Sequence, residues 1–336
     1  MRVAIVNDLA LAREVLKRLL LSVPGYRIAW TAVDGLEAVR KAAEDTPDAI
    51  LMDLVMPGMD GVEATRRIMK DNPCPILLVT SSVSGNYSMV YEAMGHGGLD
   101  AVNTPTLDRD GTVRDGQGLL VRLSHLANAK RVGSVPLAIS SPSDRPARAA
   151  PPLLALGAST GGPEALARIV AALPTEFPAA TVIIQHIGVD FVPSLVGWLQ
   201  GRSRLRVRSA SAGDTPQVGE ILVAASNDHL ILNRDGRLAY RDEPKDYPYR
   251  PSVDVFFGSL AAQWPNPGVA ALLTGMGADG ARGLLHLRQA GWLTLAQDQS
   301  TSVVYGMPQA AAQLGAARHI LPLSDLAEAI NAHFLR

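Results

Sequence analysis

The chain has 336 residues, which is enough for two domains that each bury a full core. Its 31 Lys and Arg residues balance 32 Asp and Glu residues, a formal net charge of −1 that excludes the broad basic surface used for nucleic-acid binding. The single cysteine, Cys74, excludes an internal disulfide. Without a recognisable leader or an apolar run of membrane-spanning length, we expect a cytoplasmic protein with no membrane insertion.

Strands and helices are predicted to alternate along the first part of the chain. Apolar stretches indicate strands at 2–6, 28–32, 50–52, 76–80 and 101–103. Helical periodicity lies between them, at 10–21, 36–44, 62–69 and 89–94. This alternation predicts an α/β domain with a parallel, doubly wound sheet.

Two acids follow predicted strands of this first domain. Asp8 comes after the strand at 2–6, and Asp53 comes directly after the strand at 50–52. The carboxyl ends of parallel strands lie at one edge of the sheet, so the two acids form an oxygen-rich pocket there. Such a pocket suits Mg²⁺, which keeps several waters and binds carboxylates together with a phosphoryl group.

A change of composition separates the two halves of the chain. Between 127 and 151 the sequence becomes rich in Ser, Pro, Arg and Ala and has no apolar periodicity. We interpret this segment as a linker between a domain at 1–126 and a second domain at 152–336.

A tight glycine turn with one serine opens the second domain. The run Gly157-Ala158-Ser159-Thr160-Gly161-Gly162-Pro163 predicts the end of a strand, a turn and a helix start, with Pro163 in the first helical turn. A G-x-S-x-G turn presents its serine hydroxyl at a sheet edge, beside N–H groups that can hold an oxyanion. Plain turns and phosphate-binding loops share this pattern, so Ser159 also needs a histidine and an acid.

Among the seven histidines, His186 is the best candidate for the base. It follows the apolar run 181–185 and therefore lies at the carboxyl end of a predicted strand, where open α/β sheets place their ligand sites. We interpret His229 as a turn residue and His286 as a helix residue, and we expect both to be structural.

The candidate acid is Asp279, which follows a predicted strand at 269–273 through a glycine-rich turn. Asp254 and Asp298 are its rivals, and Asp254 is interpreted as a cap near the start of a helix. The resulting order is Ser159, His186, Asp279. The α/β-hydrolases run serine, acid, histidine, so this order excludes their fold.

Four segments together resemble the CheB-type methylesterases: GASTGGP from Gly157, Gln185-His186 after a strand, GMGADG from Gly275, and AQDQSTSVVYGMPQAA from Ala296. The resemblance implies an α/β domain with a Rossmann-like parallel sheet. It implies Ser159 as nucleophile, His186 as general base and acid, and Asp279 as the residue that orients the imidazole. It also implies that Thr160 and Met276 line the oxyanion region, with no cofactor for the esterase. The implied substrates are glutamyl methyl esters on the cytoplasmic helices of methyl-accepting receptors.

The segment LMDLVMPGMDG at 51–61 resembles the phosphorylation site of response-regulator receiver domains, which have a flavodoxin-like fold. The resemblance implies that Asp53 is the phosphoacceptor and that Asp8 and Asp53 bind Mg²⁺, with Asn7 in the neighbouring acidic position. Thr80 would meet the phosphoryl group. The phosphodonor would be a CheA-type histidine kinase.

Three departures from the receiver pattern bear on this site. Asn7 replaces an acid and so removes one charge from the metal site. Thr104 stands where receivers carry a lysine, and Ala101 stands near the position of an aromatic switch residue. Since a threonine cannot neutralise a phosphoryl group as an ammonium does, we predict weakened coupling between phosphorylation and activity.

Within the family, segments 5–12, 92–100 and 103–105 resemble the methylesterase of the Wsp surface-sensing pathway. Two other functions stay open at this point. The same triad can hydrolyse glutamine side-chain amides, because an acyl-enzyme also forms from an amide. Alternatively, the chain is a non-enzymatic response regulator whose second half binds a partner or DNA.

Overall fold

The computed structural model describes residues 1–81, 86–108, 112–128, 150–245, 247 and 249–335. The chain divides into two compact units, Met1–Val132 and Gly133–Arg336. The predicted linker at 127–151 lies outside the described residues except at its two ends.

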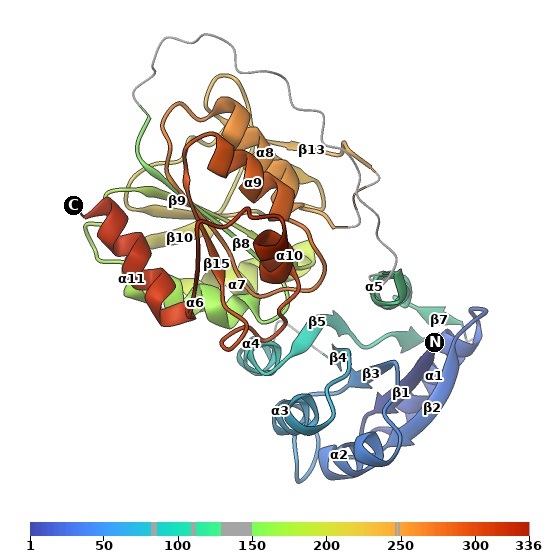
Figure 1. Cartoon of the computed structure of the whole chain (residues 1–336). Helices are drawn as coiled ribbons and strands as arrows, with labels where there is room; N and C mark the ends of the chain where they lie inside the picture. Colours follow the sequence, from blue (N-terminus) through green and yellow to red (C-terminus); the bar gives the residue numbers. More distant parts are fainter. Residues whose placement is uncertain (82–85, 109–111, 129–149, 246, 248, 336) are drawn as a thin grey trace. The chain divides into compact units, whose positions relative to one another are not determined.

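The first unit contains a five-stranded parallel sheet in the order β2-β1-β3-β4-β5 (Figure 1). Its elements are β1 (Arg2–Val6), α1 (Ala10–Leu21), β2 (Arg27–Ala32), α2 (Gly35–Glu44), β3 (Ala49–Met52), α3 (Gly61–Asp71), β4 (Ile76–Thr80), α4 (Tyr87–Gly95), β5 (Gly98–Asn103), β6 (Thr106–Leu107), β7 (Val113–Arg114) and α5 (Gln117–Asn128). The predicted parallel, doubly wound sheet is thereby confirmed. The short antiparallel pair β6–β7 was not predicted.

Local sequence explains where these elements begin. Every residue of β3 and β4 is buried, which accounts for their continuous apolar sequences. Asp34 and Asp60 cap helices α2 and α3, and their carboxylates accept the N–H groups of Glu37 and Glu63 at 2.8 and 2.9 Å. These caps fix the connections at the carboxyl edge of the sheet.

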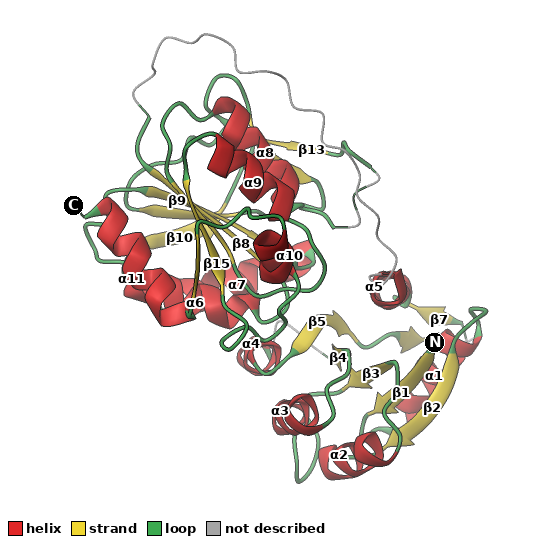
Figure 2. Cartoon of the chain, viewed as in Figure 1, coloured by secondary structure: helices red, strands yellow, loops and turns green. Residues whose placement is uncertain are grey.

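The second unit is built on a seven-stranded parallel sheet in the order β10-β11-β9-β8-β14-β15-β16. Its elements are β8 (Leu153–Ala158), α6 (Gly162–Ala172), β9 (Ala180–Gln185), the short 3₁₀ helix η1 (Val189–Phe191), α7 (Val192–Gln200), β10 (Arg206–Ser209), β11 (Glu220–Val223), β12 (His229–Leu232), β13 (Leu238–Arg241), α8 (Val253–Gln263), β14 (Val269–Leu272), α9 (Ala281–Gln289), β15 (Leu293–Gln297), α10 (Met307–Gln313), β16 (His319–Leu321) and α11 (Leu323–Phe334). Helices α8 and α9 cover one face of this sheet, and α6, α7 and α11 cover the other (Figure 2).

Strand order brings three distant segments together. Strand β8 pairs with β9 on one side and with β14 on the other, and all three run in the same direction. The residues that follow them, from Ser159, His186 and Thr274 onward, therefore meet at one edge of the sheet.

One predicted local structure is wrong. His229 does not lie in a turn, because it begins β12, which pairs antiparallel with β13 beside the main sheet. The apolar residues that follow it alternate between two covered surfaces, and this burial extends the strand back to His229.

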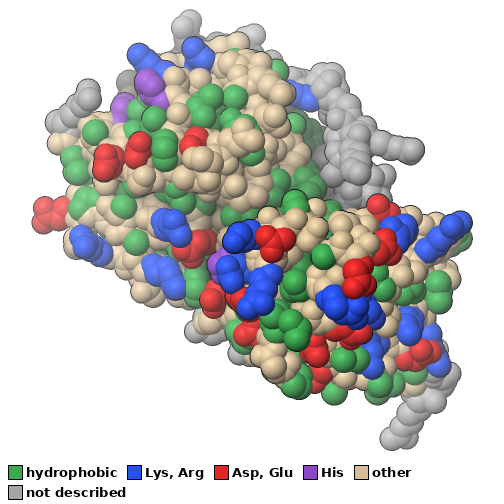
Figure 3. All heavy atoms as spheres, turned by 60° about the horizontal axis from the view of Figure 1, so that its bottom comes forward, with side chains coloured by type: hydrophobic (Ala, Val, Ile, Leu, Met, Phe, Trp, Pro, Cys, Tyr) green, Lys and Arg blue, Asp and Glu red, His purple; other side chains and the backbone are tan. Residues whose placement is uncertain are grey.

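The described surface shows no field of one charge sign on the face drawn in Figure 3, where Lys and Arg side chains lie among Asp and Glu side chains. Many of these charges are paired on the same helix, as in Arg66 with Glu63 and Arg168 with Glu164.

Candidate functional site

The turn that carries Ser159 joins β8 to α6 and is held by contacts from two neighbouring strands. The N–H of Ser159 donates to the Thr274 carbonyl at 3.0 Å, and its carbonyl accepts from Nε2 of Gln185 at 2.8 Å. Gly161 has φ 75°, in the left-handed region that favours glycine. A Cβ on Gly162 would lie 2.0 Å from Oε1 of Gln185. Both glycines are therefore required by the fold of this turn.

His186 and Asp279 form a buried pair beside this turn. Nε2 of His186 lies 2.7 Å from Oδ2 of Asp279, and the two side chains are 8% and 3% exposed. Among the described residues, Nδ1 of His186 is buried and has no hydrogen-bond partner. Nδ1 is thus the ring nitrogen that no protein group engages, and no hydrogen bond joins it to Ser159 within the described residues.

The Asp279 carboxylate accepts three further hydrogen bonds from the start of helix α8. They come from Oγ of Ser252 at 2.7 Å, the N–H of Val253 at 2.7 Å and the N–H of Asp254 at 3.1 Å. Burial acts to raise the pKa of Asp279, but the hydrogen bond and charge of His186 and these donors outweigh it and hold the pKa below its usual value. Asp279 is therefore fixed as a carboxylate.

The ring of Tyr249 stacks on the ring of His186, a contact that the sequence analysis did not predict. The two ring centroids are 4.4 Å apart and the planes differ by 3°. Burial raises the pKa of Tyr249, and the nearby Asp279 charge adds to this. Tyr249 lies in the connection between β13 and α8, and no local motif marks it.

The glycine-rich turn after β14 runs against the serine. A Cβ on Gly275 would lie 2.7 Å from Cβ of Ser159, so the turn passes in direct contact with that serine. Within the described residues, the N–H groups of Thr160 and Met276 donate no hydrogen bond to protein. Their place as oxyanion donors stays a prediction.

The structure places the rival candidates elsewhere. His286 lies in α9, as predicted, and Asp298 orders its own loop by accepting from Ser300 and Thr301. Asp254 was interpreted as a cap at the start of its own helix, which is wrong. Ser252 caps α8, and the Asp254 side chain accepts the N–H of Gly283 in α9 at 2.8 Å.

Asp254 is a second buried acid beside Asp279. Burial raises the pKa of its carboxyl to about 7, and the Asp279 charge acts in the same direction. Its side chain faces α9, whereas its backbone N–H faces Asp279, so it supports the site and does not line it.

In the first unit, Asp53 lies at the carboxyl end of β3 and is buried. Its Oδ2 accepts from Nδ2 of Asn7 at 2.7 Å, and its Oδ1 accepts from the N–H of Leu54 at 2.7 Å. Burial raises the pKa of Asp53 to about 6, the hydrogen bonds from the N–H groups of Leu54 and Val55 oppose this, and the nearby charge of Asp8 raises it further. The structure thus brings Asp8, Asn7 and Asp53 together.

Thr80 and Thr104 lie next to each other at the ends of β4 and β5. The N–H of Thr104 donates to the Thr80 carbonyl at 2.9 Å, and Oγ1 of Thr80 accepts from Nδ2 of Asn86 at 3.2 Å. Thr80 is fully buried.

The donor set around Asp53 fits Mg²⁺. Asp8 and Asp53 offer two carboxylates, and Mg²⁺ binds one or two carboxylates and completes its octahedron with water and phosphate oxygens. Among the described residues, no group of three or more His, Cys, Asp or Glu side chains is placed to hold a metal ion.

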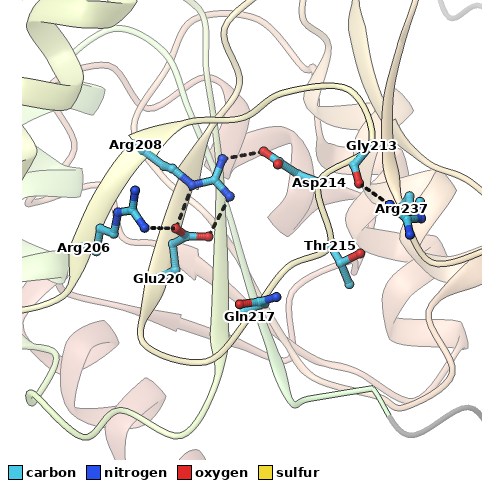
Figure 4. Close-up of a pocket in the computed structure, with 8 residues that line it drawn as sticks. All are labelled: Arg206, Arg208, Gly213, Asp214, Thr215, Gln217, Glu220 and Arg237. Carbon is cyan, nitrogen blue, oxygen red and sulfur yellow. Dashed lines mark hydrogen bonds and ion pairs between the residues drawn. The ribbon is translucent and has the colours of Figure 1, made fainter.

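A separate hollow lies at the outer edge of the second sheet, around β10 and the loop that follows it (Figure 4). Strands β11 and β9 separate it from β8. Its central Arg208 donates to both carboxylate oxygens of Glu220, at 2.7 and 2.8 Å, and also pairs with Asp214 at 2.5 Å. Both acids that line the hollow therefore pair with this arginine.

Two families of known proteins match this chain, one in each unit. The CheB methylesterase family matches residues 154–330, and the response regulator receiver domain family matches residues 3–110. A protein-glutamate methylesterase/protein-glutamine glutaminase 4 of Burkholderia thailandensis is 50% identical over 330 residues, covering 98% of this chain and 96% of that protein. A protein-glutamate methylesterase/protein-glutamine glutaminase of Mesorhizobium japonicum is 50% identical over 331 residues, covering 98% of each.

A solved structure agrees with these relatives. The CheB methylesterase catalytic domain of Thermotoga maritima is 33% identical, with a TM-score of 0.51, and covers 53% of this chain and 96% of that structure. Within the described residues, none of the helices has the length and hydropathy needed to cross a membrane. The methylesterase match over the second unit argues against a non-enzymatic response regulator. The chain belongs to the CheB methylesterase family and joins a receiver domain to a methylesterase domain.

Proposed function

We propose that this chain hydrolyses glutamyl methyl esters on the cytoplasmic domains of methyl-accepting receptors, which places it in the cytoplasm. The observation that carries the proposal is the state of the His186 ring. Nε2 is held by Asp279 at 2.7 Å, while Nδ1 is buried and unpaired among the described residues. An imidazole oriented by a carboxylate, with its second nitrogen free beside a serine turn, is what a general base requires. The names of the relatives support the substrate class.

In the proposed reaction, Ser159 attacks the ester carbonyl while Nδ1 of His186 takes the hydroxyl proton. The tetrahedral intermediate collapses, the imidazolium returns the proton to the leaving oxygen, and methanol departs. Water then attacks the acyl-enzyme while His186 takes a proton from it, and the glutamate side chain and Ser159 are released. The Asp279 carboxylate stabilises the imidazolium in both halves.

Backbone groups would hold the negative oxygen of the intermediates. We assign this to the N–H groups of Thr160 and Met276, which have no protein acceptor among the described residues. Removing one such donor typically lowers kcat by about 10²- to 10³-fold.

A glutaminase activity at the same site is the second candidate. The relatives named above carry both activities in their names. The acyl-enzyme would be the same, with ammonia leaving in place of methanol.

We further propose that phosphorylation of Asp53 regulates the esterase, with a CheA-type histidine kinase as phosphodonor. Asp8 and Asp53 would hold Mg²⁺, which neutralises charge on the phosphoryl group when bound. The likeness to the Wsp-type methylesterase suggests that the enzyme resets a receptor of a surface-sensing pathway.

Methanol release from receptor membranes carrying a labelled methyl group tests the activity. The Ser159→Ala variant removes the nucleophile, and Ser324→Ala, at an exposed position on α11, is the matched control. We expect the first to lose methanol release and the second to retain it. Unchanged release by Ser159→Ala would overturn the serine mechanism, and ammonia release from unmodified receptors in the same assay measures the glutaminase.

A further inference from the structure

We propose that His229 and Ser252 are positioning residues of the triad, with the His229 ring fastening both ends of the chain segment that contacts His186 and Asp279. The inference rests on the proposed function, since it concerns the same triad. Neither residue touches the reacting atoms. Both act through the groups that they hold.

Ser252 is the link to Asp279. It is fully buried and caps α8, and its hydroxyl contacts Oδ1 of Asp279 at 2.7 Å. An ionised carboxylate only accepts hydrogen bonds, so the single hydroxyl proton must point to Asp279. The oxygen of that hydroxyl then accepts the N–H of Val255 at 3.3 Å. The first turn of α8 and the Asp279 carboxylate are thereby locked together.

His229 fixes the backbone of Ser252. The N–H of Ser252 donates to Nδ1 of His229 at 3.1 Å, and the other ring nitrogen, Nε2, lies 3.0 Å from the Pro244 carbonyl. Since Nδ1 accepts, Nε2 must carry the proton and donate to Pro244. Both nitrogens of the neutral ring are satisfied. His229 has no exposed surface, and burial lowers its pKa, which favours this neutral form.

The two partners of His229 are the two ends of one connection. Strand β13 ends at Arg241, Pro244 follows it, and Ser252 stands immediately before α8. Tyr249, which stacks on His186, belongs to the same connection. The His229 ring therefore holds this connection at Pro244 and at Ser252. Between these two points the connection carries Tyr249, and Ser252 itself donates to Asp279.

A purely structural histidine would fill space, and an apolar side chain of similar size could replace it. The arrangement here requires an acceptor at the position of Nδ1, because an apolar residue would leave the buried N–H of Ser252 unpaired. An asparagine can supply its Oδ1 at that position, whereas a leucine cannot. The comparison of the two variants separates positioning from packing.

The first test is the tautomer of His229 in the native full-length protein. Labelling histidine with ¹⁵N and recording the ring nitrogens by NMR should show His229 protonated on Nε2 and accepting at Nδ1. The His229→Asn variant should remove these signals, which distinguishes them from those of His186. A His229 protonated on Nδ1 would overturn the proposal, because that nitrogen could not accept from Ser252. This measurement does not depend on catalysis.

The second test is kinetic and uses His229→Leu, His229→Asn and the control His319→Leu at an exposed position on β16. Each is assayed for methanol release and for the rate at which a fluorophosphonate labels Ser159. We expect His229→Leu to lower kcat and the labelling rate by about 10²-fold with KM little changed, since small misplacements of catalytic groups have effects of this size. His229→Asn should recover most of the loss, and His319→Leu should match the native protein.

Each outcome decides between positioning and packing. Native rates in His229→Leu, or equal losses in the leucine and asparagine variants, would overturn the proposal. If His229→Leu does not fold, the test passes to Ser252→Ala, which keeps the backbone N–H and should lower the labelling rate, and to Ser252→Thr, which should restore it. If labelling depends on His229 but no methanol is released from receptors, the proposed function fails while the positioning role stands.

Discussion

Two buried aspartates, one in each unit, lie in opposite electrostatic environments. Asp53 and Asp279 each follow a strand of a parallel sheet, and each is 7% exposed. Asp53 accepts from the Asn7 amide and from the N–H of Leu54, and its pKa is raised to about 6, chiefly by burial. Burial also opposes ionisation of Asp279, yet its pKa lies below the usual value because a histidine and three α8 donors surround it.

Equal burial therefore does not decide the charge of these two groups. Their charge is decided by the number and charge of the hydrogen-bond donors and neighbours around each carboxyl. These donors favour the ionised form of Asp279, which suits its proposed role of orienting an imidazole and stabilising the charged form of that ring. Asp53 has fewer donors and an acidic neighbour, Asp8, so its charge responds to what binds beside it. This property suits the proposed role of Asp53, which is to receive a phosphoryl group next to Mg²⁺.

We expect the largest effect when the Asp279 carboxylate, which accepts four hydrogen bonds, is replaced by an amide. In Asp279→Asn an NH₂ group faces donors that previously met an oxygen, and the imidazole loses its negative partner. We expect kcat for methanol release to fall by about 10³- to 10⁴-fold, as for the acid of other serine triads. Asp235→Asn, in an exposed turn, removes the same charge elsewhere and should have no effect. A loss below tenfold would show that the charge of Asp279 is not used.

The sequence predicted the three strand-end positions because the carboxyl ends of parallel strands share one edge of the sheet. Ser159, His186 and Asp279 each follow a strongly apolar run, so strand direction predicted that they share one edge of the sheet. Their adjacency depends on the strand order β9-β8-β14, which the sequence pattern did not predict. The β-α alternation of the first unit was equally readable.

The supporting contacts could not be predicted in the same way. Tyr249 and His229 meet the site through the connection between β13 and α8, whose path depends on tertiary packing. Ser252 did carry a signal, since a serine directly before an apolar helical run is a preferred N-cap. Assigning that role to Asp254 concealed the residue that holds Asp279.

Titration by NMR measures the difference in ionisation between Asp53 and Asp279 directly. ¹³C NMR of protein labelled at aspartate carboxyls should show Asp53 titrating near pH 6, so its ionised fraction falls about tenfold between pH 7 and pH 5. Asp279 should stay ionised throughout this range. Because the folded pKa of Asp53 exceeds its unfolded value near 4, its protonation also stabilises the receiver as pH falls through this window. Asp53→Asn identifies the signal, and a midpoint near 4 would contradict the raised pKa.

The Asn7 amide donates a hydrogen bond to Asp53, and Asn7→Asp replaces this donor with an acid. The variant exchanges a donor for a second negative charge near Asp8 and Asp53. We expect the affinity for Mg²⁺ to rise about tenfold, equivalent to roughly 1.4 kcal/mol, because the cation gains a carboxylate. Calorimetric titration with Mg²⁺ measures this. Asn72→Asp, which adds the same charge at the end of α3, is the control, and an equal gain there would indicate a general charge effect.

The smallest expected effect concerns the transmission of phosphorylation. The backbone of Thr104 is fixed against Thr80, but its side chain brings no positive charge to the phosphoryl group. We therefore expect only modest activation of the esterase when Asp53 binds beryllium fluoride with Mg²⁺. Thr104→Lys should raise the ratio of activated to basal methanol release by about fivefold, the effect of 1 kcal/mol of coupling. The control variant Thr104→Met has a side chain about as long as lysine but without its charge, and it should leave this ratio unchanged. If the native chain is already activated by about 100-fold, near the upper end of typical allosteric coupling, the missing ammonium does not limit transmission and the role assigned to position 104 is wrong.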